Sequence, residues 1–266
     1  MCPHGARLLQ GEGGVLDRAR LVCHCLAIES GDGIVLVDTG FGTEDVEHPR
    51  QLGRPFLALT SPRLRREDTA LARLAELGFE AGDVRHIAVT HLDPDHSGGL
   101  PDFPEAQVHV FAAEYAAAMN PKLTERSRYI GAHWSHEPKW VTHATAGDEW
   151  HGFESVRVLP GSDPEVLLVP LIGHSRGHTG VAVRDGDGWM LHCGDSYFFR
   201  GEIETPPRCP PGMRIFQTLN QADGRARHEN QERLRELARR GGDGLRLFCS
   251  HDPVQLERAQ SAALSN

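Results

Sequence analysis

The sequence predicts an α/β protein in which two β-sheets pack together and helices lie outside them. Apolar runs of strand length begin near the N-terminus, at 22–30 and 33–40, and similar runs return between 156 and 249. A helical segment at 67–79 separates these two groups of strands. Amphipathic strands and helices must cover their apolar faces, so strand groups separated by helices favour a layered arrangement.

The N-terminal half is expected to contain both strands and helices. "VCHCLAIES" (22–30) and "GIVLVDTG" (33–40) flank a "GDG" turn, which indicates a β-hairpin. The segment 67–79 carries leucines at helical spacing and ends at Gly78. Two further strands are expected at 84–90 and 106–113, and the second runs into the helical stretch "AAEYAAAMN".

The C-terminal half repeats this alternation. Its expected elements are strands at 156–159, 165–173, 180–185, 189–195 and 245–249, with a charged helix at 228–240. The segment 120–152 is rich in Trp and His and is predicted to be irregular. A length of 266 residues suits one domain that spans the whole chain, 1–266.

Composition narrows the class of partner. The formal net charge is -9, which argues against a dedicated nucleic-acid binder. The sequence has no run of ~18 apolar residues that would span a membrane. The N-terminal stretch "MCPHGARLLQGEGG" lacks the apolar core of a signal peptide. We therefore expect a cytoplasmic protein that acts on a small molecule and binds neither nucleic acid nor membrane.

The six cysteines include no CxxC pair, and free thiols are expected in a reducing compartment. The "CHC" stretch at 23–25 could indicate metal binding. It lies inside the predicted strand at 22–30, however, where neighbouring side chains point to opposite faces. The strand interpretation is therefore preferred for Cys23 and Cys25.

The stretch "THLDPDHSGGL" (90–100) carries the strongest chemical signal. Four of its residues can bind a metal, namely His91, Asp93, Asp95 and His96. Residues two apart in an extended chain face the same way, so His91 and Asp93 can point at one ion. Pro94 then turns the chain, which lets the next two side chains face another direction. Two ions ~3.5–4 Å apart would fit this arrangement.

Three other apolar strands also end abruptly in metal-binding residue types. "LIGHSRGHTG" carries His174 and His178, "LHCGDSYF" carries Asp195, and "LFCSHDP" carries His251. Loops at strand ends can converge on one sheet edge, where functional sites usually lie. A metal centre is therefore expected in place of a polar loop with chance histidines.

These motifs, in this order and together with Asp38 in "VDTG", resemble those of the metallo-β-lactamase superfamily. The likeness covers roughly residues 20–255. Within the superfamily, the chain looks most similar to the lactonase-like hydrolases, through "LVCHCLAIESGDGIVLVDTG" and the closing "SHDP". The resemblance implies an αββα sandwich with a dinuclear metal site at one edge of its two sheets.

The resemblance also implies a role for each motif residue. It places His91 and His174 at the first ion, Asp195 between the ions, and Asp95, His96 and His251 at the second ion. His174 is preferred to His178 because the family's ligand is the first histidine of this motif. Asp38, and with less support His178, would hold the site through hydrogen bonds.

Position 93 departs from the family pattern, which has a histidine there. An aspartate adds a negative charge and a harder ligand, and carboxylate-rich sites accept Mn and Fe as well as Zn. We therefore expect two divalent ions, zinc foremost, with Mn or Fe able to compete at the first site. The alternative is that Asp93 turns away and leaves that site incomplete.

The expected reaction is hydrolysis of a small ester, lactone or amide by a metal-activated hydroxide. Asp95 would orient the water or relay its proton. Tyr197 is a candidate hydrogen-bond donor to the substrate, although the corresponding tyrosine of lactonases lies one residue further on. A packed aromatic side chain is the alternative for Tyr197. Motifs for a serine nucleophile or a nucleotide cofactor do not occur in the sequence.

Two rival functions remain open at this point. Members of this fold also bind one iron through two histidines and an aspartate and oxidise thiols. His91, His174 and Asp195 could supply such a triad. A non-catalytic metal-binding module is the other alternative. Metal analysis separates the first two, since two ions per chain favour hydrolysis and one iron favours oxygenation.

The segment 128–153 is expected to cover the mouth of the site and to govern substrate choice. Trp134, Trp140 and His133 are its candidate substrate contacts, because an irregular stretch this aromatic should be tied down. The alternatives are an ordinary packed loop or a contact between the subunits of a homodimer.

Overall fold

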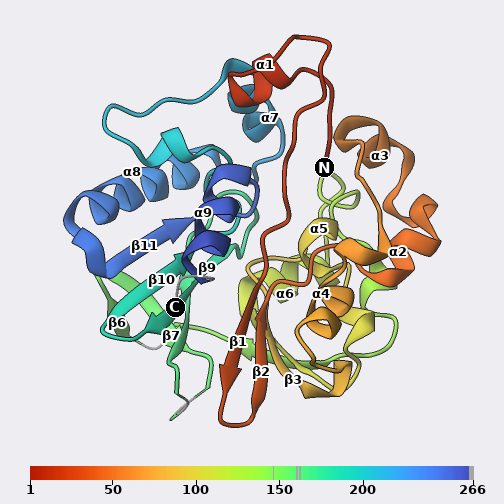
Figure 1. The fold of residues 1–266 in the computed structure, drawn as a ribbon, viewed down its shortest axis with the longest axis vertical. Helices are drawn as coiled ribbons and strands as arrows, with labels where there is room; N and C mark the ends of the chain where they lie inside the picture. Colours follow the sequence, from red (N-terminus) through yellow and green to blue (C-terminus); the bar gives the residue numbers. More distant parts are fainter. Residues whose placement is uncertain (146, 160, 162, 264–266) are drawn as a thin grey trace.

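Two mixed β-sheets face each other with helices on their outer sides in the computed structural model (Figure 1), which describes residues 1–145, 147–159, 161 and 163–263. The first sheet has the order β1-β2-β3-β4-β5. Its strands are β1 Leu26–Ser30, β2 Gly33–Val37, β3 Val84–Ala88, β4 Gln107–Phe111 and β5 Lys139–His143. β1 and β2 form the predicted antiparallel hairpin, while β2 to β5 run parallel.

The second sheet has the order β11-β10-β9-β8-β7-β6. Its strands are β6 Asp148–Trp150, β7 Phe153–Arg157, β8 Val166–Pro170, β9 Thr179–Asp185, β10 Gly188–His192 and β11 Leu245–Phe248. Neighbours are antiparallel except β10 and β11, which are parallel. β8, β10 and β11 therefore run in one direction, and their carboxyl ends meet at one edge of the sheet.

The core between the sheets follows from the alternation of side chains along the strands. Val35 and Val37 of β2 pack against Leu168 and Val181 of the opposite sheet. The intervening Ile34 and Leu36 belong to the cluster on the helix side of the first sheet. Because both faces of β2 are covered, its sequence is a continuous apolar run.

The helices cover the outer faces and the ends of the sheets. In chain order they are α1 Ala6–Gln10, α2 Thr43–Glu47, α3 Arg54–Thr60, α4 Ala70–Glu76, α5 Pro94–Ser97, α6 Ala112–Met119, α7 Pro211–Leu219, α8 Gly224–Arg240 and α9 Pro253–Ala263. α6 contacts the first sheet, whereas α8 contacts β11 of the second sheet (Figure 1). In the part of the chain that the structure describes, no helix combines the length and apolar character needed to cross a membrane.

The predicted fold class is confirmed, and two sequence expectations need correction. The expected irregular segment 120–152 contains β5 and β6, the edge strands through which the chain passes from one sheet to the other. Edge strands are short and only half-buried, so their apolar pattern is weak. The strand expected from residue 22 begins at Leu26, and Cys23 to Cys25 precede it.

A row of hydrogen-bonded histidines crosses the first sheet on the face toward the second. His86 Nδ1 lies 3.0 Å from His109 Nε2, and His109 Nδ1 lies 2.9 Å from His143 Nε2. Burial, and then the neighbouring His143 and His86, lower the pKa of His109 to about 3. The folded protein therefore holds this ring neutral in a pH range where an unfolded chain would protonate it.

This row is expected to make the protein less stable in acid. Between pH 6.5 and about 3 the unfolded chain binds more protons at His109. The free energy of unfolding should therefore decrease as the pH is lowered through this range. For this one group the decrease is up to about 1.4 kcal/mol per pH unit. Denaturant unfolding at several pH values gives the dependence of the free energy of unfolding on pH. This dependence is expected to be weaker for His109→Leu than for the parent. The exposed His48→Leu is the matched control, and equal slopes in all three proteins would contradict the prediction.

Candidate metal centre

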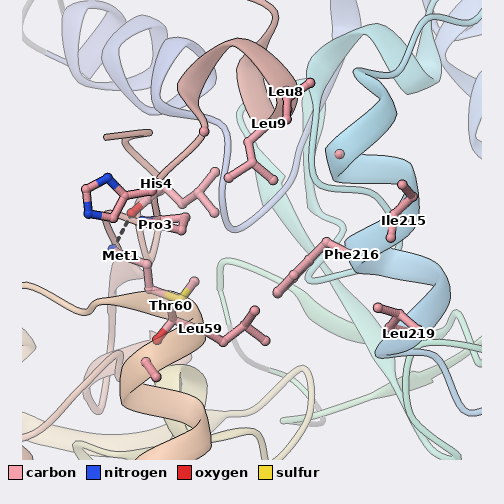
Figure 2. Close-up of a pocket in the computed structure, with 14 residues that line it drawn as sticks. Met1, Pro3, His4, Leu8, Leu9, Leu59, Thr60, Ile215, Phe216 and Leu219 are labelled. Atoms are coloured by element: carbon pink, nitrogen blue, oxygen red, sulfur yellow. Dashed lines mark hydrogen bonds between the residues drawn. The ribbon is translucent and has the colours of Figure 1, made fainter. Parts of the chain in front are cut away.

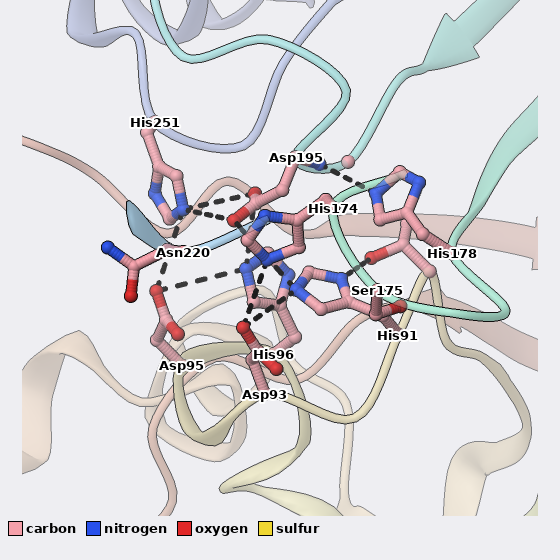
Figure 3. Close-up of polar contacts among 12 residues, drawn as sticks. His91, Asp93, Asp95, His96, His174, Ser175, His178, Asp195, Asn220 and His251 are labelled. Atoms are coloured by element: carbon pink, nitrogen blue, oxygen red, sulfur yellow. Dashed lines mark hydrogen bonds and ion pairs between the residues drawn. The ribbon is translucent and has the colours of Figure 1, made fainter. Parts of the chain in front are cut away.

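The expected ligand residues converge where strands of both sheets end (Figure 3). His91 and Asp93 lie in the loop after β3, and Asp95 and His96 lie on the short helix α5 that follows it. The second sheet contributes its residues from the loops after β8, β10 and β11, namely His174, Asp195 and His251. The shared direction of these three strands brings the loops to one edge, so residues distant in sequence meet there.

One group of donor atoms surrounds the position expected for a first ion. His91, His174 and Asp195 each offer an atom within 4.8 Å of the others. Asp93 Oδ2 lies 3.0 Å from His174 Nε2 and 3.5 Å from His91 Nε2. Ligands of a tetrahedral zinc ion, bound at about 2.0–2.1 Å, are separated by about 3.3 Å. These distances therefore suit one ion, with Asp93 beside it and not turned away.

A second group lies on the other side of Asp195. His96, Asp195 and His251 also offer donor atoms that lie within 4.8 Å of one another. His251 Nε2 lies 3.1 Å from Asp195 Oδ1. Asp95 Oδ2 lies 3.6 Å from His251 Nε2 and 3.8 Å from His96 Nε2. Asp195 Oδ2 is 3.5 Å from His174 Nε2 of the first group. The Asp195 carboxylate therefore belongs to both donor groups.

Several of these atoms are buried acceptors that lack a hydrogen-bond partner in the described structure. They include His91 Nε2, His96 Nε2 and Asp195 Oδ1, and all three side chains are at most 4% exposed. An unsatisfied buried polar atom costs about 1–3 kcal/mol. Divalent cations are the partners that such converging imidazole nitrogens and carboxylate oxygens accept together. The residues present thus fit a metal centre.

The outer nitrogens of the histidines are held by fixed partners. Asp38 receives hydrogen bonds from Thr90 N at 2.7 Å and from His96 Nδ1 at 2.8 Å. Burial opposes ionisation of Asp38, but the adjacent His96 outweighs it and lowers the pKa of this carboxyl. His251 Nδ1 donates to Val22 O at 2.7 Å. These contacts fix the ring orientations and leave both Nε2 atoms facing the centre.

His178 uses both ring nitrogens elsewhere. Its Nδ1 donates to Leu171 O at 3.0 Å, and its Nε2 accepts from the backbone N–H of Asp195 at 2.8 Å. Burial lowers the pKa of His178 well below its usual value, which keeps Nε2 available as an acceptor. His178 therefore positions the Asp195 loop, while His174 faces the donor group.

Arg128 is a neighbour of the first group that the sequence analysis missed. Its Nη1 donates to Asp93 Oδ1 at 3.0 Å, to Asp93 Oδ2 at 2.9 Å and to His174 Nε2 at 2.9 Å. Burial alone would raise the pKa of Asp93, but Arg128 and His91 hold it well below its usual range. Burial and then Arg128 lower the pKa of His174 to about 4. Asp93 with Arg128 carries the same net charge as the neutral histidine of the family pattern. Arg128 Nη1 contacts the Asp93 oxygens and the His174 Nε2 lone pair that a first ion would need, so a bound ion would have to displace Arg128 from these atoms.

Glu114 of α6 is a second missed residue, and it ties the two metal-binding loops together. Its buried carboxylate accepts hydrogen bonds from Leu92 N at 3.0 Å and from Ser175 Oγ at 2.6 Å. It also accepts from Gly177 N at 3.1 Å. A Cβ at Gly177 would collide with the backbone of Glu114, so only glycine permits this approach. Glu114 could not be recognised from the sequence, because it lies in an ordinary helical stretch.

Tyr197 does not reach the site, which corrects its candidate role as a substrate donor. Its ring is fully buried in the cluster between the second sheet and α8, and its hydroxyl accepts from Gln255 Nε2 at 3.2 Å. The next residue, Phe198, faces the centre instead. Its ring stacks on His251 with centroids 4.8 Å apart. The position therefore supplies an apolar wall and no hydroxyl.

The aromatic residues of 128–153 also lie elsewhere than expected. Trp134 and Trp140 pack with Tyr115 against the helix-side cluster of the first sheet, so they are not substrate contacts. His133 is buried, and its Nε2 lies 2.9 Å from Asp45 Oδ1. Large aromatic side chains are buried wherever the apolar core lies. The sequence alone did not show that these tryptophans would face the helix side of the first sheet.

Comparison with known proteins identifies the family. The sequence profile of the metallo-β-lactamase superfamily matches residues 18–251. The chain belongs to the metallo-β-lactamase superfamily. The two mixed sheets with outer helices are the αββα sandwich of this superfamily.

Relatives within the superfamily are metallo-hydrolases and lactonases. The chain is 43% identical over 244 residues to a probable metallo-hydrolase of Mycobacterium tuberculosis, which covers 91% of this chain and 78% of the relative. It is 31% identical over 160 residues to an N-acyl homoserine lactonase of Bacillus thuringiensis. This match covers 60% of this chain and 57% of the relative. The family and these relatives support a metallo-hydrolase of the lactonase-like kind.

Solved structures agree on the fold. A variant of the B. thuringiensis lactonase AiiA, with N-decanoyl-L-homoserine bound at its active site, superimposes with a TM-score of 0.71. The match has 21% identity and covers 97% of this chain and 92% of that one. The dizinc quorum-quenching lactonase AidC matches with a TM-score of 0.63 and 15% identity, over 95% of this chain and 84% of that one. At these identities the likeness extends to the fold alone.

Proposed function

We propose that this chain is a metal-dependent hydrolase of a small ester, lactone or amide, and that its centre holds two divalent ions. The observation that carries this proposal is the pair of donor groups on either side of Asp195. When bound, two such ions would supply hydroxide near neutral pH and polarise a carbonyl oxygen. Zinc suits the imidazole and carboxylate donors. The carboxylate of Asp93 would allow Mn or Fe to compete with zinc at the first site.

The chain's own residues would position the reacting groups. Asp195 Oδ2 lies 3.5 Å from His174 Nε2 of the first group, and both Asp195 oxygens lie 3.1 Å from His251 Nε2 of the second, so this carboxylate would link the two sites. Asp95 lies at the outer side of the second group and can orient a water or accept its proton. Phe198 stacks on His251 and excludes bulk water from that side.

An apolar cavity that two aromatic rings connect to His251 favours a substrate with an apolar arm. The cavity measures ≈ 380 Å³ and lies between α1, α3 and α7 (Figure 2). Its lining includes Leu8, Leu9, Leu59, Ile215, Phe216 and Leu219. Phe216 contacts Phe198 with centroids 5.7 Å apart, and Phe198 stacks on His251. The Phe216 and Phe198 rings therefore connect this cavity to His251 of the second donor group.

The alternative of a single-iron oxygenase uses only part of this arrangement. His91, His174 and Asp195 are close enough for such a triad. The second group around His96 and His251 is equally complete, and one iron would leave it unused. The hydrolase accounts for both groups.

A substrate panel on metal-loaded protein tests the proposed function. Lactones, esters and amides with short and long apolar chains should be hydrolysed, with kcat/KM rising with chain length. β-Lactams and thioesters complete the panel. Chelator treatment should abolish turnover, and adding back zinc should restore it. Oxygen consumption with a thiol, together with one iron per chain, would instead establish the oxygenase.

A further inference from the structure

We propose that Cys23 is a sulfur ligand of the ion in the second group, in addition to Asp95 and His251. The Cys23 Sγ and one donor atom each of Asp95 and His251 lie within 4.8 Å of one another. The inference rests on the proposed metal centre and extends it to a residue outside the superfamily motifs quoted above.

The backbone fixes Cys23 in this position. Val22 and His24 flank it, and both donate backbone hydrogen bonds to the loop after β11: Val22 N to His251 O at 3.3 Å and His24 N to Ser250 O at 2.9 Å. The His24 ring is buried and stacks on Phe248 with centroids 4.6 Å apart. Adjacent side chains of an extended segment point to opposite sides, so Cys23 faces the donor group.

A buried acceptor on the neighbouring helix independently points to a ligand here. His96 is 1% exposed, and its Nε2 has no hydrogen-bond partner in the described structure. This atom lies 3.8 Å from the same Asp95 Oδ2. Cys23 therefore lies beside a cluster in which the buried His96 Nε2 has no hydrogen-bond partner, and it is not an isolated thiol.

The distances suit coordination by sulfur. Zinc binds sulfur at about 2.3 Å and nitrogen at about 2.0–2.1 Å, so two such ligands on one tetrahedral ion are about 3.6 Å apart. The Cys23 Sγ lies within 4.8 Å of the donor atoms of Asp95 and His251, an upper bound that is compatible with this separation. Without a cation, burial and then Asp95 raise the pKa of Cys23 to about 12. A bound cation reverses this preference, because a coordinating thiol loses its proton.

A sulfur ligand would make the two sites chemically different. The first has the harder donors, with Asp93 and Asp195 beside two imidazoles. The second would combine imidazole, carboxylate and thiolate, and soft thiolate favours Zn, Co or Cd over Mn. We therefore expect the second site to retain Zn or Cd while the first exchanges more readily with Mn or Fe.

Cobalt spectroscopy on the full chain tests this ligand directly. Co²⁺-loaded parent protein is expected to show a thiolate-to-cobalt charge-transfer band in the near ultraviolet. Cys23→Ser should lose this band and keep the visible bands of bound cobalt. Cys25→Ser, two residues away and outside the donor group, is the matched control and should retain the charge-transfer band. In a competition titration, Cys23→Ser should bind Cd²⁺ more weakly by on the order of tenfold, with little change for Mn²⁺.

The outcomes separate this inference from the proposed centre. Cobalt bound to the parent without a charge-transfer band, or a band that survives in Cys23→Ser, would overturn Cys23 as a ligand and leave the hydrolase standing. Parent protein that binds no cobalt would overturn both. Alkylation of the unmutated protein gives a readout without substitution: zinc should slow modification of Cys23 and not of Cys2.

Discussion

His251→Ala is expected to remove the second ion and to lower kcat/KM by at least about 10³-fold. His251 Nε2 is 3.1 Å from Asp195 Oδ1 and 3.6 Å from Asp95 Oδ2, so the substitution deletes a central donor of that group. Loss of one metal forfeits several kcal/mol of charge stabilisation, and each 1.36 kcal/mol corresponds to a tenfold change in rate. His96→Ala should behave alike, because His96 supplies the other imidazole of the same group.

Elemental analysis and steady-state kinetics check this expectation together. Both variants should fall from about two ions per chain to about one, with the first site retained. His228→Ala, on the exposed side of α8, is the control that removes a histidine outside the centre. Unchanged metal content in both His251→Ala and His96→Ala would show that these residues are not ligands.

Asp93→Ala is expected to empty the first site and to spare the second. Asp93 Oδ2 approaches the nitrogens of both His91 and His174, so it can complete the first donor group. The substitution also leaves the buried Arg128 guanidinium without its carboxylate, so its positive charge is no longer balanced where the first ion would bind. A competitive metal titration should therefore show one tight and one much weaker site.

Arg128 determines how the reverse experiment should be designed. Asp93→His restores the family's nitrogen ligand, and by ligand type alone it should raise zinc occupancy at the first site. Arg128 would then lack its anion and still contact His174 Nε2. We expect the full gain only in Asp93→His combined with Arg128→Met, which restores a neutral ligand set. If Asp93→Ala binds two ions as tightly as the parent, Asp93 is not a ligand.

The fold class was predictable because its signal is local. The segment 165–173 is apolar from Val166 onward, as a strand covered on both faces must be, and β8 lies within it. Leucines at helical spacing in 67–79 marked α4 in the same way. β5 and β6 escaped prediction because edge strands bury little, and their Trp and His content indicated an irregular loop.

The centre was partly predictable for the same reason. His91 to His96 are held at fixed spacing by one short loop and α5, so their sequence already specifies neighbouring donors. Tyr197 shows the limit of that reasoning. Residues 195 to 198 are consecutive, yet the backbone turns Asp195 and Phe198 toward the centre and Tyr197 into the core.

The sequence by itself determined the family, the order of the motifs and the residue types that meet at the sheet edge. The tertiary structure alone decided the surroundings of those residues. Arg128 reaches Asp93 across 35 positions of the chain, and Cys23 approaches His251 across more than two hundred. Neither approach leaves a periodic or spaced signal, because it depends on how the N-terminal segment and the 128–134 turn pack against the strand ends. Hydrophobic patterning specifies which face of an element is buried, whereas the partners of a buried polar group are set by the assembled fold.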